Sequence, residues 1–206
     1  MKRLDHQTEH GVTLAELLVV CVVIAFVMAG LLIMLQTGAQ SYLVGSNQVE
    51  AQQTARMALA QMVQEIRNAG YCPTCAGTPP FTAIASQTGT GFTLQNDWDG
   101  DGAINTTGTV TDANGNVRGE QIVYASSSGT LTRQEVGVDA SAVTLATGID
   151  GLTFTYQDST GATTATAASI RTIVVTLTTQ PQNQPAATPQ GRVLVTMTDS
   201  ARVRNR

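Results

Sequence analysis

Charged residues, lysine and histidine are scarce in this 206-residue chain, and each shortage excludes a class of function. Charged side chains make up 13% of the sequence, against roughly 25% in soluble domains. Lys2 is the only lysine and the net charge is −4, which excludes nucleic-acid binding through a lysine-rich surface. Since the two histidines are His6 and His10, the chain after them cannot form a Ser-His-Asp or Cys-His catalytic site, or a His-ligated zinc site.

The longest apolar run extends from Leu17 to Leu35, nineteen residues without a charged side chain. As a helix it would measure about 28 Å, close to the roughly 30 Å hydrocarbon core of a bilayer. It lacks the polar stripe of a soluble core helix, and no A-x-A-like cleavage site of a secretory signal follows it. On these residues alone, the simplest interpretation is a single-pass membrane anchor.

A short polar leader, MKRLDHQTEHG, precedes this run. The residues from Gly11 onward read GVTLAELLVV and resemble the class III signal of type IV prepilins and pseudopilins, G-F-T-L-x-E-L. The resemblance implies that a prepilin peptidase cleaves after Gly11 and methylates the new amino terminus at Val12. Val12 departs from the family's usual phenylalanine, and Ile33 stands where many major pilins carry a helix-bending proline.

Glu16 lies directly before the apolar run. A carboxylate at the edge of a membrane span is costly unless it is paired or near water, so it is a functional candidate. In filaments of this family the spans pack into a core without lipid. The resemblance implies that Glu16, the fifth residue of the mature chain, pairs there with the amino terminus of a neighbouring subunit. The alternative is a glutamate that extends toward the membrane–water interface.

The helical pattern continues beyond the run, because Gln36–Ala69 contains no proline and is rich in Ala, Gln, Met and Leu. Apolar residues at steps of three and four predict one buried stripe: Ala51, Ala55, Ala58, Met62, Ile66 and Ala69, flanked by Leu59 and Val63. Gly70 is expected to cap the helix, and Pro73 prevents its continuation. The predicted helix therefore spans Val12–Ala69.

Strands and turns are predicted for the rest of the chain, where Thr, Val, Ile and Tyr alternate between glycine-rich turns. The expected strands are Gly91–Gln95, Gln121–Ala125, Thr130–Val136, Val143–Ala146, Leu152–Gln157, Ile170–Thr179 and Arg192–Thr198. Their hairpin-like spacing favours an antiparallel sheet, and the three prolines of Gln180–Gly191 predict a long loop. The predicted fold is α+β and pilin-like: a long N-terminal helix packed on an antiparallel β-sheet head.

Further matches resemble PilW-type minor pilins. Arg56–Leu59 followed by Glu65–Tyr71 is similar to their R-x-A-L…D/E-I-R-x-A-G-Y stretch. Glu120–Tyr124 followed by Gly129–Arg133 is similar to their E-x-I-x-Y…L-x-R hairpin, and Val203–Asn205 matches their V-x-R-N terminus. The J-type pseudopilin of type II secretion shares this architecture and is the nearest competing family. The implied parts are a removed leader (1–11), a transmembrane or filament-core helix (12–36), an amphipathic helix (37–70) and a β-rich head (71–206).

A minor pilin that helps to assemble or prime a type IV pilus is the function that this resemblance implies. The protein would be a structural subunit and not an enzyme. Its partners would be the prepilin peptidase, other major and minor pilins, the inner-membrane assembly platform and, before assembly, membrane lipid. The head would lie in the periplasm of a bacterium before assembly and on the pilus afterwards. The alternatives are a J-type pseudopilin, a membrane-anchored periplasmic hydrolase and an adhesin-like binding head.

Two of the three cysteines, Cys72 and Cys75, form a C-x-x-C pair just after the predicted helix. The βαβ context of a thioredoxin-like site is missing, and Ala76 replaces the histidine that haem attachment requires. In an exported domain, two cysteines this close most simply form a disulfide, whose main effect is a stiff local turn. Cys21 lies inside the apolar run and is interpreted as an apolar filler.

Alternating carboxylates in NDWDGDGA resemble the start of a calcium-binding EF-hand loop. Asp97, Asp99 and Asp101 stand at positions one, three and five, and a glycine that permits the sharp turn stands at six. Position twelve is a glycine, so the closing glutamate is missing, and Asp112, Glu120 or water would have to replace it. The alternative is a solvated Asp-Gly turn.

Overall fold

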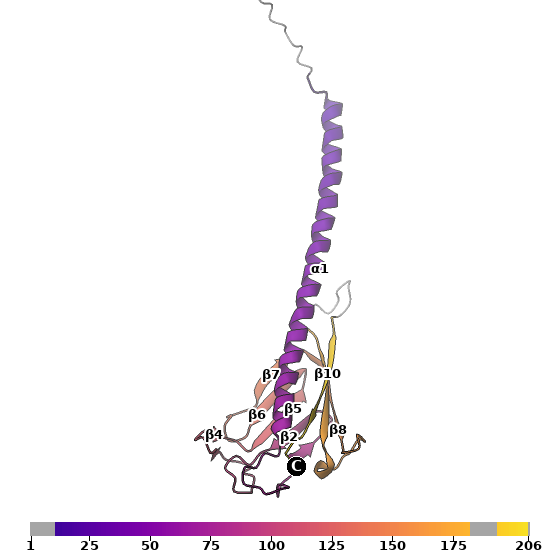
Figure 1. The fold of residues 1–206 in the computed structure, drawn as a ribbon. Helices are drawn as coiled ribbons and strands as arrows, with labels where there is room; N and C mark the ends of the chain where they lie inside the picture. The colour runs from indigo at the N-terminus through magenta and orange to yellow at the C-terminus, as the bar shows by residue number, and fades with distance from the viewer. Residues whose placement is uncertain (1–10, 182–192, 206) are drawn as a thin grey trace, which may run out of the picture. The chain divides into compact units, whose positions relative to one another are not determined.

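The fold contains one long helix, followed by antiparallel β-structure (Figure 1). It is described from a computed structural model over residues 11–181 and 193–205. Helix α1 spans Leu14–Asn68, so the predicted helix is confirmed and begins two residues later and ends one residue earlier than expected. The chain divides into two compact units, one up to Gly45 and the other from Ser46 onward.

The first unit consists of the N-terminal part of α1, residues 14–45, and the residues before it. Every side chain of the apolar run Leu17–Leu35 is exposed in the isolated chain. By length and composition, α1 is the one helix among the described residues that is apolar enough to cross a membrane. It is therefore compatible with a single-pass membrane anchor.

The second unit begins with the C-terminal part of α1 and buries one face of it. The buried residues are the stripe expected from the sequence: Ala51, Ala55, Ala58, Leu59, Met62, Val63, Ile66 and Ala69. Small residues in this stripe let the β-structure approach closely, and Thr179 Oγ1 donates a hydrogen bond of 2.9 Å to the carbonyl oxygen of Ala51. Gly70 follows the helix with φ +78°, a left-handed conformation that suits glycine at a helix C-terminus.

A five-stranded antiparallel sheet forms one layer of the unit, with strand order β1-β2-β5-β6-β7. Its strands are β1 (Ile84–Gln87), β2 (Gly91–Gln95), β5 (Gln121–Ser127), β6 (Thr130–Glu135) and β7 (Val143–Thr147). A three-stranded antiparallel sheet of order β10-β9-β8 forms another layer. It consists of β8 (Ile149–Gln157), β9 (Thr172–Thr179) and β10 (Val195–Arg202). A short 3-10 helix, η1 (Ala167–Ser169), precedes β9.

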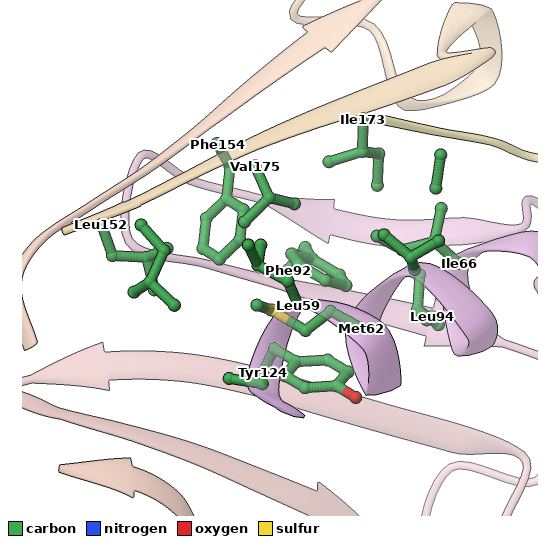
Figure 2. Packing of buried hydrophobic residues seen from close by; sticks show 14 of the residues in the cluster. Leu59, Met62, Ile66, Phe92, Leu94, Tyr124, Leu152, Phe154, Ile173 and Val175 are labelled. Atoms are coloured by element: carbon green, nitrogen blue, oxygen red, sulfur yellow. The ribbon is translucent and has the colours of Figure 1, made fainter. Parts of the chain in front are cut away.

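The hydrophobic core lies between α1 and the inner faces of both sheets, as Figure 2 shows. Phe92 of β2 joins the two sheets, because its ring centroid lies 5.0 Å from that of Tyr124 on β5 and 4.9 Å from that of Phe154 on β8. The register Leu152↔Leu177 and Phe154↔Val175 places apolar residues of β8 and β9 on this inner face. The α+β prediction is confirmed, with most of the antiparallel strands divided between two main sheets and one short hairpin apart from them.

All seven expected strands are present, and the structure adds some that the pattern did not indicate. Strand β1 has a single buried residue, Ile84, and a register shift before Ser86, so its sequence shows no clear alternation. The β3–β4 hairpin (Val110–Thr111 and Val117–Arg118) is too short to have a period. Most of the predicted loop Gln180–Gly191 lies outside the described residues, as does the start of the strand expected at Arg192.

Candidate functional site

The residues of the predicted processing signal lie at the start of α1. Gly11 and Val12 are exposed and precede the helix, while most of the leader lies outside the described residues. The backbone N–H of Glu16 donates to Thr13 Oγ1 at 3.3 Å, and the Glu16 carboxylate accepts from the backbone N–H of Thr13 at 3.5 Å. This reciprocal pair is a capping box, S/T-x-x-E, which satisfies two backbone donors at a helix N-terminus. Glu16 therefore has a local structural role that the sequence TLAE already indicates and that our sequence analysis missed.

The acidic loop, residues 97–102, follows β2 in the second unit. Asp97 is fully buried, and its carboxylate accepts hydrogen bonds from the backbone N–H groups of Gly100 (2.6 Å) and Gly102 (2.9 Å). These bonds fold the loop around one carboxylate. Gly100 and Gly102 have φ of +78° and +84°, which a residue with a side chain adopts only with strain. The glycines at these positions are therefore required by the turn.

Glu120, at the start of β5, joins this loop from another part of the chain. Its side chain is buried, and its two oxygens accept from the backbone N–H groups of Trp98 (2.8 Å) and Asn105 (2.7 Å). One carboxylate oxygen from each of Asp97, Asp99 and Glu120 lies within 4.8 Å of the other two. Hard oxygen ligands this close together suit a divalent cation, calcium above all.

The charge on this cluster is unfavourable in the isolated chain. Burial raises the pKa of Asp97 and of Glu120, although backbone N–H groups oppose the shift in both cases. The negative charge of Asp99 raises the pKa of each residue further. Like charges in a poorly solvated place disfavour ionisation, and a bound cation would offset that cost.

Other residues predicted to complete the loop lie differently. Asp101 is exposed and is not part of the converging group; its carboxylate accepts from the backbone N–H of Ala103 at 2.7 Å. Asn105 stands at position nine of the EF-hand-like pattern counted from Asp97, but its side-chain oxygen accepts from the backbone N–H of Gly108 at 3.0 Å and so stabilises its own turn. The Asp112 carboxylate accepts from the backbone and side chain of Asn116. The carboxylate that reaches Asp97 from outside the loop is therefore that of Glu120 and not that of Asp112.

Cys72 and Cys75 form a disulfide, as expected from the sequence, with a Cα–Cα distance of 5.4 Å. Its neighbour is the acidic loop, because Cys72 Sγ lies 3.1 Å from Asp97 Oδ2. A disulfide sulfur carries no hydrogen, so this is a close contact and not a hydrogen bond. Cys21 is a free cysteine and lies in the other unit.

Aromatic side chains cover the loop. The ring centroid of Tyr71 lies 5.1 Å from that of Trp98, and the guanidinium of Arg118 lies 4.3 Å from the Trp98 ring centroid. A cation over an indole ring is attracted to its π-face. The loop is therefore held by its own backbone, by Glu120 and by this aromatic cover.

No protein-family model and no curated protein matches this chain. The fold, one long apolar N-terminal helix with antiparallel sheets, is compatible with a pilin-like fold.

Proposed function

We propose that this chain is a minor pilin of the PilW type, which helps to assemble or prime a type IV pilus. A prepilin peptidase would cleave it after Gly11 and methylate Val12. The mature helix would span the bacterial inner membrane, with the head in the periplasm, until the subunit joins other pilins at the assembly platform. The chain acts in this proposal as a structural subunit and not as an enzyme.

The observation that carries the proposal is the combination of GVTLAE with an apolar helix that has no partner of its own in the described structure. Residues such as Phe26 (76% exposed) and Met34 (74%) present large apolar surfaces to solvent. Exposed apolar area of this extent is unfavourable in water, so the helix requires lipid or neighbouring helices. The core residues of the head all belong to the second unit.

Filament incorporation tests the proposal, and Glu16 is the residue to change. Glu16→Gln removes the charge but keeps a side chain that can form the capping box, whereas Glu16→Ala removes both. Both variants should insert in the membrane and lower the amount of the chain in sheared filaments by roughly tenfold or more, as expected for breaking a buried ion pair. Glu50→Gln, an exposed position on the same helix, is the matched control.

The outcomes separate the two roles of Glu16. Normal incorporation of Glu16→Gln with a defect in Glu16→Ala would show that Glu16 only caps the helix, which contradicts charge pairing. Normal incorporation of both variants would contradict a role in assembly. Recovery of the chain with secretion components instead of pilus subunits would favour the J-type pseudopilin.

We further propose that the head binds calcium through Asp97, Asp99 and Glu120. The convergence of these three carboxylates from two segments favours this over a solvated turn. Their backbone bonds leave lone pairs on the same oxygens, since each carboxylate has about four acceptor sites. Calcium would link the loop to the start of β5.

Thermal unfolding of the full chain in detergent micelles, in millimolar calcium or in chelator, tests this second proposal. Calcium at about 100 times its dissociation constant would stabilise the head by about 2.7 kcal/mol and raise its melting temperature. Asp99→Asn should abolish the rise, whereas Asp101→Asn, which removes the same charge from the same loop, should retain most of it. Equal melting temperatures with and without calcium, and no binding heat in calorimetry, would contradict calcium binding.

A further inference from the structure

The segment that carries the disulfide lies directly against the acidic loop. Thr74 Oγ1 donates to the carbonyl oxygen of Gly100 at 2.5 Å, and the carbonyl oxygen of Tyr71 accepts from the backbone N–H of Asp97 at 2.8 Å. The approach is close, since a Cβ added to Gly100 would lie 2.8 Å from Thr74 Cγ2. The two segments are separated by more than twenty residues in sequence, and these contacts hold one against the other.

Asp97 connects the disulfide to the interior of the loop. Its Oδ2 atom accepts from Gly102 N–H at 2.9 Å and also contacts Cys72 Sγ at 3.1 Å. In the oxidised chain the sulfur carries no hydrogen and only contacts this oxygen, while Gly102 N–H donates to it. The disulfide is therefore compatible with the hydrogen bond from Gly102 N–H to Asp97, which closes the loop. It also holds Thr74 beside Gly100.

We propose that the Cys72–Cys75 disulfide is a redox-sensitive lock on the conformation of residues 97–102. A dithiol reductant would open it by thiol–disulfide exchange: the reductant's sulfurs are oxidised to a disulfide, the S–S bond of the chain breaks, and the reductant's two protons end on Cys72 and Cys75. The new Cys72 S–H lies within reach of Asp97 Oδ2, which has a lone pair left beside the bond from Gly102 N–H. Thr74, released from the closed turn, no longer stays fixed beside Gly100.

The surroundings of the cysteines favour a lock over a redox catalyst. Reactive thiols lie in electropositive places that stabilise the thiolate, as beside lysine, arginine or a helix N-terminus. Here Cys72 Sγ lies 3.1 Å from the carboxylate of Asp97, and carboxylate oxygens of Asp99 and Glu120 lie within 4.8 Å of that carboxylate. The pair therefore lacks the electropositive surroundings of a redox catalyst, which favours a structural lock.

Hydrogen exchange of the full chain in detergent micelles tests the lock. Mass spectrometry measures the exchange before and after reduction with dithiothreitol. Both samples contain chelator, so that no bound cation contributes to the protection. Reduction should speed exchange in peptides covering 97–102 by about fivefold, the factor that corresponds to one lost hydrogen bond. The peptide covering Leu152–Gln157 of β8 should not change. The Cys72→Ser/Cys75→Ser variant should exchange like the reduced chain without dithiothreitol.

Thr74→Val separates the lock from a general effect of reduction. It removes the hydrogen bond to Gly100 without changing the cysteines, so it should speed exchange at 97–102 even in the oxidised chain. Unchanged exchange at 97–102 after reduction would overturn the proposal. An equal rise at 97–102 and at Leu152–Gln157 would also overturn it, because the disulfide would then support the whole head and not this loop.

Discussion

Arg133 on β6 is the residue that ties the sheet to the helix by charge. Its guanidinium pairs with Glu65 of α1 at 2.9 Å, with Glu135 at 3.0 Å and with Asp139 at 3.4 Å. Tyr124 completes the network by donating to Glu65 at 2.6 Å, and burial, with the charge of Glu65, raises the pKa of its hydroxyl, which stays protonated. Arg133 thus contacts three largely buried carboxylates, of which Glu135 also pairs with Arg118 at 3.4 Å.

Replacing this cation should destabilise the head more than replacing a surface arginine. In Arg133→Met the three carboxylates lose their shared partner, and we expect a loss of roughly 2–3 kcal/mol, below the full cost of a completely buried pair because the side chains retain some exposure. The exposed Arg202→Met on β10 is the control and should stay within about 0.5 kcal/mol. Thermal unfolding by near-ultraviolet circular dichroism measures both, and equal melting temperatures would contradict the role of Arg133.

Individual site residues were predictable to different degrees. Asp97 and Asp99 follow from local spacing, because the ligands of a loop lie close in sequence. Glu120 was only one of several candidates, since its approach depends on how β5 pairs with β2. The capping box of Thr13 and Glu16 could have been read from the sequence. It was missed because the same residues belong to the prepilin-like signal, and Glu16 was therefore interpreted as an assembly residue.

Helix α1 is the element that the sequence predicts best. Its 3.6-residue period is local, so the buried stripe could be named residue by residue before the fold was known. Strand β1, with one buried residue, and the two-residue strands β3 and β4, with none, lack such a period. They form because partner strands or turns position them. The division of the strands into two sheets also depends on distant pairing and was not predicted.

Two alanines of α1 that are two residues apart give a matched test of the stripe. Ala58 is 1% exposed and packs in the core, whereas Ala60 is exposed on the same helix. Ala58→Leu should overpack the core and lower the free energy of unfolding by about 1–3 kcal/mol. Ala60→Leu should have little effect, because leucine and alanine have similar helix propensities. A larger effect at Ala60 than at Ala58 would contradict the observed face of the helix.

The whole molecule combines a self-sufficient head with a helix segment whose apolar surface is exposed. The head has its own core, its own ion-pair network and a disulfide. The first unit has an apolar surface that water does not solvate well. This division is what a subunit needs if the same segment first resides in lipid and later packs against other subunits. The apolar run indicated an anchor-like segment from the sequence alone, whereas the contacts inside the head required the structure.

The central claim is that the chain is processed as a prepilin, and the mass of its mature N-terminal peptide tests it most directly. The chain is extracted from membranes of cells with an active prepilin peptidase, and from cells without that enzyme as a control. The account predicts an N-terminal peptide that starts at Val12 and carries one methyl group on its amino nitrogen, in the first sample alone. An intact Met1 terminus in cells with active peptidase, or cleavage at another residue, would contradict it.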